Sequence, residues 1–532
     1  MNLSKDQIIN KAIEFHIQGN INEATRYYKY LIEKDIADNN VFSNYGAILQ
    51  SQGKLKEAEI SYRKAIKLDP NFANAYSNLG IILQDMGILK EAEISYRKAI
   101  ELNPNFANAH LNLGNLLIDI GKLKEAEIFY RKAIVLDPNL AEAFFNLFLH
   151  YDKINDLKKL EESLQEFRNN VCITNELLLF QSRLSFRNKE YRAARKLINN
   201  ISNQWLEKIK NNQEIRYWSY KAFIEDKLEN YDIAYACFKK SQDDSSYAKF
   251  RKEFYLDHID SYRKSIINKD INLNYFNDGI DDSKIVFLIG FPRSGTTLLN
   301  LILESHPDIE VMEEKPLIEI IEKFVKNKFN LNFENIFNLS KADLIFLRQQ
   351  YFKLLREYNS NDAKLMIDKL PLHTVCIPLI NLIFPNSKII FTYRNPYDTV
   401  LSCFQQTFKP NNAMANLLSL ESSSILYDKV MNAWDIYKNN HSLKFIESKY
   451  ENLIENFDQQ IGRILIFLDV EWHENIRNYR KTALQRGRIT TPSSSQVIQP
   501  LYRSSIEKWK NYEKYFENCH QYLKKWSIYF NY

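Results

Sequence analysis

The chain has 532 residues, too many for one hydrophobic core, and this length favours about three to four domain-sized units. Lys and Arg number 71 and Asp and Glu number 66, so the net charge is only +5; this suits a small-anion site but gives no support for general nucleic-acid binding. Only 12 glycines and 13 prolines are present, so long helices with short connections should dominate.

The N-terminal residues run directly into a polar helical pattern and lack the apolar core of a signal peptide. No apolar run in the sequence is long enough to span a bilayer. The five cysteines are widely spaced and form no CxxC pair, so neither a disulfide framework nor a zinc site is expected. We therefore expect a cytoplasmic protein without a membrane span.

A repeat of 34 residues occupies the first part of the chain. Three segments that align without gaps begin at Lys54, Ile88 and Lys122, and a weaker copy begins at Asn20. The period places small and aromatic residues at fixed positions: Ala24, Ala58, Ala92 and Ala126, and Tyr28, Tyr62, Tyr96 and Tyr130. Prolines end the second helix of three copies, because proline cannot continue a hydrogen-bonded turn: Pro70, Pro104 and Pro138.

This pattern resembles the tetratricopeptide repeat, a helical hairpin that buries its apolar face by stacking on copies of itself. We expect such repeats over residues 1–155. The glycine at the position of Gly114 becomes Phe148 in the next copy, so the repeat loses regularity there. Residues 156–267 keep a helical pattern and are predicted to form degenerate repeats, followed by a polar linker over 268–283.

Four asparagines recur with the same period and fall on one face of the predicted array: Asn44, Asn78, Asn112 and Asn146. A similar ladder in the repeats of the O-linked N-acetylglucosaminyltransferases lines a groove that holds peptide backbone. An amide side chain offers a donor and an acceptor to an extended chain of any sequence. The ladder therefore indicates a protein or peptide partner held by the repeats, and turn or interhelix contacts are the alternative.

The second domain is predicted to begin at residue 284 and to run to residue 532. A buried strand over 284–289 is followed by Gly290-Phe-Pro-Arg-Ser-Gly-Thr-Thr297 and then by an apolar helix. Strand, loop and helix in this order aim backbone N–H groups at a phosphate. The spacing is close to that of the triphosphatase loop, but Thr296 stands at the lysine position, which argues against a triphosphatase or kinase.

A second strand, over 388–393, leads into Arg394, with Ser402 eight residues later on the following helix. An arginine fork and a hydroxyl are suitable hydrogen-bond donors to a phosphate dianion.

Both motifs resemble those of the sulfotransferase superfamily, which uses 3′-phosphoadenosine 5′-phosphosulfate as donor. The resemblance implies that the donor's 5′-phosphosulfate contacts the loop residues, and that its 3′-phosphate contacts Arg394 and Ser402. It further implies donor contacts by Tyr450 and by Ser493, within a run of serines whose register stays open at 493–495. The loop residues are Arg293, Ser294, Gly295, Thr296 and Thr297.

The segment Leu303–Asp308, followed by Glu313 and Glu314, is similar to the tyrosylprotein sulfotransferases within this superfamily. That resemblance implies a carboxylate as the general base, and alignment without gaps places it on Glu314, with Glu313 as the alternative. If the strands at 285–289 and 309–312 are parallel, both glutamates lie beside the phosphate loop.

Lys369 matches the lysine that neutralises the donor's bridging oxygen, and Arg293 adds charge from the loop. The cytosolic sulfotransferases instead use a histidine two residues after this lysine. Here Pro371 stands at that position and His373 is out of register. Arg, Lys and backbone dipoles can balance a single sulfuryl group, so no metal is expected.

The predicted architecture is an N-terminal all-α tetratricopeptide-type solenoid followed by an α/β domain with a P-loop-like parallel sheet. The predicted function is transfer of a sulfuryl group to a hydroxyl acceptor, with protein tyrosine as one candidate. A glycan or a small metabolite as acceptor stays open, as does a catalytically silent repeat scaffold.

Overall fold

The computed structural model describes residues 4–170, 174–208, 212–243, 245–267, 281–358, 364–440, 442–481 and 505–532. The chain divides into two compact units, Met1–Phe180 and Gln181–Tyr532. None of the described helices has the length and apolar character that a membrane-spanning helix needs.

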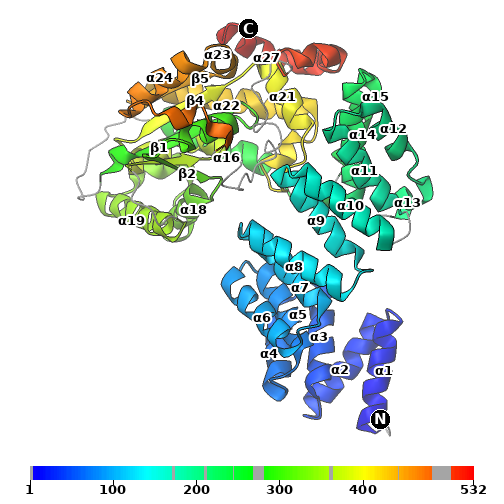
Figure 1. Ribbon diagram of the computed structural model, residues 1–532. Coiled ribbons are helices and arrows are strands. Elements are labelled where there is room, and N and C mark those ends of the chain that lie inside the picture. Colours follow the sequence, from blue (N-terminus) through cyan, green and yellow to red (C-terminus); the bar gives the residue numbers. More distant parts are fainter. Residues whose placement is uncertain are drawn as a thin grey trace. The chain divides into compact units, whose positions relative to one another are not determined.

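The first unit is built from helices that pair as successive hairpins (Figure 1). Their bounds are α1 Lys5–Ile17, α2 Ile21–Glu33, α3 Asn39–Ser51, α4 Leu55–Leu68, α5 Ala73–Asp85, α6 Leu89–Leu102, α7 Ala107–Asp119, α8 Leu123–Leu136, α9 Ala141–Ile154 and α10 Leu157–Asn170. Helices α4, α6 and α8 each end two residues before a repeat proline, because the proline nitrogen cannot donate the next helical hydrogen bond. The predicted hairpin repeat is confirmed.

Glycine and tyrosine set the close approach of the two helices in a hairpin. A Cβ atom added to Gly80 on α5 would lie 2.6 Å from Cε1 of Tyr96 on α6. Tyr96 is 1% exposed, and its hydroxyl donates to Oε1 of Gln84 at 3.1 Å. The same glycine–tyrosine contact recurs one repeat earlier and one repeat later, so the sequence repeat corresponds to a repeated packing contact between the two helices of each hairpin.

The regular pattern changes at α9, where Phe148 stands in place of the repeat glycine. Phe148 packs edge-to-face on Phe167 and Phe180, with ring centroids 6.0 and 5.2 Å away. Phe144 and Phe145 extend this aromatic cluster. Aromatic rings thus fill the space that the glycine–tyrosine contact occupies in the earlier hairpins.

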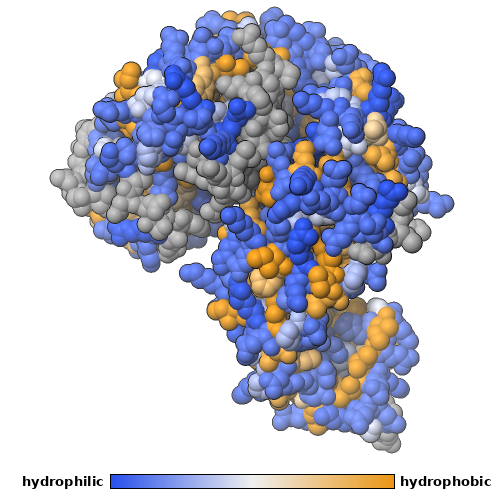
Figure 2. All heavy atoms as spheres, viewed as in Figure 1, coloured by the Kyte–Doolittle hydropathy of each residue, from blue (hydrophilic) through white to orange (hydrophobic). Residues whose placement is uncertain are grey.

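The visible face of the repeat helices carries patches of hydrophobic side chains between hydrophilic ones, as Figure 2 shows. Ile60, Ile94 and Ile128 occupy the same position in three repeats and are 56%, 67% and 65% exposed. Each lies on the second helix of its hairpin, two residues before the buried repeat tyrosine. Residues two apart lie on nearly opposite sides of a helix, so these isoleucines face away from the hairpin core.

The second unit contains further helices packed on a sheet. The helices before the sheet are α11 Asn175–Arg187, which begins in the first unit, α12 Tyr191–Asn199, α13 Asn203–Lys208, α14 Asn212–Lys227, α15 Tyr231–Ser241 and α16 Lys252–Ile267. Phe238 of α15 and Ile259 of α16 belong to the same buried cluster as the sheet residues Phe287 and Phe391. Helices α15 and α16 therefore complete the core of the sheet domain.

Polar contacts reinforce this packing. The Tyr512 hydroxyl donates to Asp226 at 2.6 Å, and Lys508 pairs with the same carboxylate at 2.8 Å. Tyr235 stacks on Tyr515 with ring centroids 3.6 Å apart. The boundaries expected near residues 155 and 267 stay predictions, and most of the expected linker, residues 268–280, lies outside the described residues.

Five described strands form one parallel sheet in the order β2-β3-β1-β4-β5 (Figure 1). They are β1 Ile285–Gly290, β2 Ile309–Glu313, β3 Leu365–Lys369, β4 Lys388–Tyr393 and β5 Lys444–Lys449. Alternate residues of β1 belong to different buried clusters, Phe287 to one and Leu288 to the other, so both faces of the sheet are covered. The predicted α/β architecture with a parallel sheet is confirmed.

The helices of this domain are α17 Thr296–Glu304, α18 Leu317–Asn327, α19 Lys341–Tyr358, α20 Ile377–Ile383, α21 Pro396–Phe404, α22 Leu420–Asn440, α23 Tyr450–Glu455, α24 Phe457–Leu468 and α27 His520–Tyr529. Short 3₁₀ helices are η1 Ser245–Tyr247, η2 Asp282–Lys284, η3 Phe333–Asn338, η4 Pro371–Thr374, η5 Met414–Leu417, η6 Glu474–Ile476, η7 Lys508–Tyr515 and η8 Glu517–Cys519. Because the strands are parallel, their carboxyl ends lie at one edge of the sheet, where open sheets of this kind bind ligands.

Candidate active site

The loop between β1 and α17 is held against the end of β4. A Cβ atom at Gly290 would lie 2.4 Å from the carbonyl oxygen of Thr392, so only glycine allows the two strands to approach this closely. Ser294 Oγ and Thr392 Oγ1 are 2.8 Å apart. Arg293 has a φ of +70° and Gly295 a φ of +102°, the left-handed conformations that turn the chain into α17.

Helix α17 begins at Thr296 directly after this turn, with Gly295 as its N-cap residue and no side-chain cap. The first amide groups of a helix have no partner within the helix and carry a partial positive charge. Thr296 and Thr297 occupy the first two positions, so the loop and the helix N-terminus together present backbone donors for an anion. This is the arrangement that the loop sequence predicts.

Two arginines from different segments lie at this edge. Arg293 Nε donates to Ser402 Oγ on α21 at 2.9 Å, although these residues are 109 positions apart. Arg394, just beyond β4, is 7% exposed and its guanidinium carbon lies 5.1 Å from the ring centroid of Tyr450. Its Nη2 donates to the carbonyl oxygen of Ser505. The structure thus brings four of the predicted donor-binding residues together as two contacting pairs.

Tyr450 is the first residue of α23 and closes the other side of the loop. A Cβ atom on Gly295 would lie 2.7 Å from Cδ2 of Tyr450, so the glycine also makes room for this ring. The Tyr450 hydroxyl lies 3.3 Å from Ser505 Oγ. Ser505 therefore contacts both Arg394 and Tyr450, and sequence reasoning missed it. Ser493 lies outside the described residues.

Asp398 fixes the segment that follows Ser505. Its carboxylate accepts from the backbone N–H groups of Glu507 and Trp509 at 2.7 and 2.9 Å, and it lies 3.9 Å from Arg394. Burial raises the pKa of Asp398, and the nearby arginine opposes that shift. This aspartate is a further residue of the site that the sequence does not single out.

Lys369 ends β3 beside the loop and contacts two carboxylates. Its side chain is fully buried, and Nζ lies 2.8 Å from Glu314 Oε1 and 3.4 Å from Glu313 Oε1. Glu313 pairs with Lys369 in the sheet register, and the backbone N–H of Glu314 donates to the Lys369 carbonyl at 2.9 Å. The expectation that this strand runs parallel to β1 is confirmed, although Glu313 is its last residue and β3 lies between β2 and β1.

The two glutamates differ in exposure and in backbone conformation. The side chain of Glu314 is 37% exposed and that of Glu313 is 15% exposed. Glu314 has a φ of +49°, which a residue with a side chain adopts at a cost of about 1 kcal/mol or more. The strained backbone turns Glu314 out of the strand while its carboxylate stays on Lys369. An incoming molecule can therefore reach Glu314 more readily than Glu313.

His373 lies in the interior on η4, 1% exposed. Its Nδ1 is 3.7 Å from Asp368 Oδ1, and its Nε2 is 3.6 Å from Glu319 Oε2. Asp368 also accepts from the Tyr351 hydroxyl at 2.8 Å. Burial raises the pKa of Asp368 to about 6; for His373, burial lowers the pKa, but the two carboxylates outweigh it and raise the pKa above its ordinary value.

Protein-family models match segments in both parts of the chain. Residues 286–474 match the model of the sulfotransferase family, and models of the tetratricopeptide repeat match residues 46–87, 73–106 and 95–128. The chain carries tetratricopeptide repeats and a sulfotransferase-family domain.

Three relatives match part of the chain. An uncharacterized protein of Aquifex aeolicus is 31% identical over 250 residues, which cover 44% of this chain and 32% of that protein. The protein-tyrosine sulfotransferase of Drosophila melanogaster is 23% identical over 42% of this chain and 46% of its own length. Protein-tyrosine sulfotransferase 1 of Danio rerio is 23% identical over 43% of this chain and 66% of its own length. The matched segments thus span from a third to two thirds of these three relatives.

Among solved structures, a tetratricopeptide repeat protein from Parabacteroides merdae matches 45% of this chain and 93% of its own chain, at 19% identity and a TM-score of 0.37.

The asparagine ladder of the repeats lies on the first helix of each hairpin, α3, α5, α7 and α9, and all four side chains are half-buried. Asn146 Nδ2 donates to Asn115 Oδ1 at 2.8 Å, and that oxygen also accepts from the Tyr130 hydroxyl at 2.9 Å. Asn146 therefore takes part in an interhelix contact, which is the alternative that the sequence left open for the ladder.

Proposed function

We propose that the sulfotransferase domain transfers a sulfuryl group from 3′-phosphoadenosine 5′-phosphosulfate to a hydroxyl group. One observation carries this proposal: the Lys369–Glu314 ion pair and the phosphate loop lie at the same edge of one parallel sheet. A buried cation beside an anion-binding loop can balance charge on a departing phosphate, and an exposed carboxylate on the same cation can accept a proton.

The donor fits the two arginine-containing motifs. The 5′-phosphosulfate would contact the backbone donors of the loop, Arg293 and the start of α17. The 3′-phosphate would contact Arg394 and Ser402, and Tyr450 would line the donor between them. The contact of 2.9 Å between Arg293 and Ser402 supports the proposal, because it joins the two motifs into one site.

In the proposed reaction, Glu314 accepts the proton of the acceptor hydroxyl as that oxygen bonds to sulfur. The bond between sulfur and the bridging phosphate oxygen breaks, and 3′,5′-adenosine diphosphate leaves with the electron pair of that bond. Lys369 would balance the charge on the bridging oxygen, and Arg293 would add positive charge from the loop. Glu314 is preferred to Glu313 because its side chain is the more exposed and the nearer to Lys369.

The acceptor we propose is a tyrosine hydroxyl in a protein. Two of the relatives described above carry the name protein-tyrosine sulfotransferase, and an array of repeats suits a macromolecular acceptor better than a small metabolite. A glycan hydroxyl is the second candidate, because the chemistry at Glu314 and Lys369 is the same for any hydroxyl group.

Donor binding tests the proposal directly. Calorimetry with 3′,5′-adenosine diphosphate should show binding that Arg394→Ala weakens by about 1.5–3 kcal/mol, the scale of a lost charged hydrogen bond. Arg477→Ala is the matched control, because Arg477 is a half-exposed arginine that pairs with Asp458 of α24 and belongs to neither motif. Equal binding of 5′-AMP and of the 3′-phosphorylated nucleotide would contradict the assignment.

We also propose that the repeats recruit the acceptor through the ladder. An acceptor held by the repeats gains effective concentration at the active site without a change in the chemistry. The triple alanine variant of Asn44, Asn78 and Asn112 should raise the KM for a long acceptor and spare a short one. A matched control replaces three exposed asparagines that recur with the same period in the turns between hairpins: Asn71, Asn105 and Asn139. Equal KM values for both variants would give the repeats another role.

A further inference from the structure

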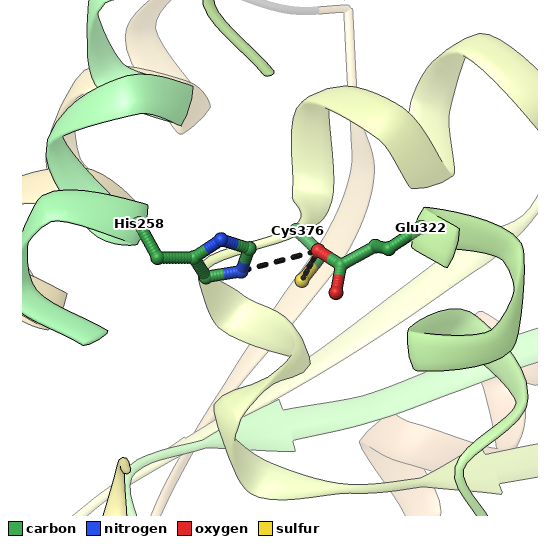
Figure 3. Close-up of side chains that lie close together, drawn as sticks. All are labelled: His258, Glu322 and Cys376. Atoms are coloured by element: carbon green, nitrogen blue, oxygen red, sulfur yellow. Dashed lines mark hydrogen bonds and ion pairs between the residues drawn. The ribbon is translucent and has the colours of Figure 1, made fainter. Parts of the chain in front are cut away.

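A histidine, a glutamate and a cysteine from three separate helical segments meet inside the second unit (Figure 3). His258 is on α16, Glu322 is on α18, and Cys376 immediately precedes α20. One nitrogen, one carboxylate oxygen and the sulfur all lie within 4.8 Å of one another. His258 and Glu322 have side chains that are 17% and 12% exposed, and Cys376 is 6% exposed, so the cluster is largely shielded from solvent.

Two of the three distances within the cluster are close to those around a tetrahedral metal ion, and the third, between the histidine nitrogen and the sulfur, is at most 4.8 Å. His258 Nε2 is 3.1 Å and Cys376 Sγ is 3.2 Å from the same oxygen, Glu322 Oε1. For zinc, bond lengths of about 2.0–2.3 Å and the tetrahedral angle place such ligand atoms about 3.4–3.6 Å apart. These two contacts would need to lengthen by only a few tenths of an ångström to admit an ion.

Three polar groups of the cluster and its surroundings contact the same carboxylate oxygen. Glu322 Oε1 is the common partner of three groups: it pairs with His258 Nε2, and it accepts hydrogen bonds from the Cys376 thiol and from the Tyr262 hydroxyl, the last at 2.8 Å. A carboxylate oxygen has two lone pairs, so three donors exceed its capacity. With a cation between them, the imidazole nitrogen and the sulfur would act as electron-pair donors to the ion, and Tyr262 would stay the hydrogen-bond donor that orients Glu322.

We propose that His258, Glu322 and Cys376 bind a divalent transition-metal ion, with zinc as the best match to this set of nitrogen, oxygen and sulfur ligands. On binding, the Cys376 thiol releases one proton and coordinates as the thiolate, His258 coordinates as the neutral imidazole, and Glu322 coordinates as the carboxylate. No residue of the phosphate loop or of the Lys369–Glu314 pair takes part, so the site is separate from the proposed sulfuryl transfer.

The placement of the ligands indicates what the ion would do. Glu322 is on the helix that follows β2 and Glu314, and Cys376 follows β3 and Lys369 by seven residues. His258 is on a helix that precedes the sheet domain in the chain. The aromatic ring of Phe333 lies against His258 and Tyr262, with centroids 4.9 and 4.7 Å away, and shields this side of the cluster. A bound ion would tie α16 to the two segments that follow the strands of the proposed catalytic pair.

Metal analysis of the purified full-length protein tests the proposal. We expect one zinc ion per chain, its removal by a chelator with a fall in melting temperature, and recovery of that temperature on adding zinc. Cobalt added to the zinc-free protein should produce the near-ultraviolet charge-transfer band of a cobalt–thiolate bond. Failure of the full-length protein to bind zinc and cobalt in stoichiometric amount would overturn the proposal without any variant.

Variants identify the ligands. Cys376→Ser should abolish the cobalt–thiolate band, and Cys237→Ser, at a buried cysteine outside the cluster, should keep it. Tyr262→Phe should also keep the band, because it removes a hydrogen bond to Glu322 but no ligand. A band that persists in Cys376→Ser, or that disappears in Cys237→Ser, would overturn the assignment and leave the cluster as a hydrogen-bonded core contact.

Discussion

Replacing Glu314 by glutamine would keep the size of the side chain, remove its charge and prevent it from accepting a proton. If Glu314 is the general base, turnover should fall by about 10²–10⁴, which corresponds to about 3–5 kcal/mol of activation free energy. The structure indicates that folding should be affected much less. The amide oxygen of the substituted side chain can still accept from Lys369 Nζ, which lies 2.8 Å from Glu314 Oε1, and Glu313 stays within 3.4 Å of that nitrogen.

The charge that is lost is also partly screened by solvent, because the Glu314 side chain is 37% exposed. We therefore expect Glu314→Gln to lower the free energy of unfolding by about 1 kcal/mol or less. Binding of 3′,5′-adenosine diphosphate should be unchanged or slightly tighter, because a negative charge has been removed beside an anion site. The predicted signature is a large loss of kcat with nearly unchanged donor binding and melting temperature.

The assay is sulfuryl transfer from labelled donor to a tyrosine-containing acceptor, run together with calorimetry and a thermal melt. Glu313→Gln is the matched control, since it makes the same chemical change at a neighbouring carboxylate on the same lysine, and it should keep most of the activity. If Glu313→Gln is inactive and Glu314→Gln is active, Glu313 is the general base instead of Glu314. If both variants stay active and His373→Gln is inactive, the carboxylate mechanism is wrong.

Three further variants test other parts of the structure. Gly295→Ala should weaken donor binding by about 1–3 kcal/mol in calorimetry, because its φ is +102° and its Cβ would lie 2.7 Å from Tyr450; unchanged binding would contradict the loop geometry. Gly80→Ala should lower the stability of the repeats by about 1–3 kcal/mol in thermal melts, through overpacking against Tyr96, and a neutral effect would refute that packing. The raised folded pKa of His373 should stabilise the protein below about pH 6.5, its unfolded value, and this contribution should vanish as the pH rises through the folded value. The stability difference between the protein and His373→Gln should therefore shrink as the pH rises above about 6.5, and a constant difference would contradict the shift.

The features that the sequence predicts best are those with a local signal. The hairpins follow from a 34-residue period, and the strand, loop and helix around Arg293 follow from a short run of residue types whose order is fixed along the chain. The same holds for Glu314, which can be placed at the edge of the sheet as soon as its strand is taken as parallel to β1.

The contacts that complete the site could not be predicted, because they join segments far apart in the chain. Ser294 and Thr392 are 98 residues apart, and Arg394 and Ser505 are 111 residues apart. The pairing of Glu313 with Lys369 depends on β3 lying between β1 and β2, an order that no local pattern specifies. The histidine–glutamate–cysteine cluster is hidden for the same reason, since its members show no metal-ligand spacing along the sequence.

Helices α14 to α16 share a core with the sheet, so they are less free to change in evolution than the repeats before them. Loss of α15 or α16 would expose the sheet-side surface that Phe238 and Ile259 cover, and loss of α14 would leave Tyr512 and Lys508 without Asp226. The hairpins of the first unit contact mainly their own neighbours, so one of them can be duplicated or deleted at little cost to the rest. Relatives of this protein should therefore vary in the number of repeats before residue 181, while helices α14 to α16 are inherited together with the sheet.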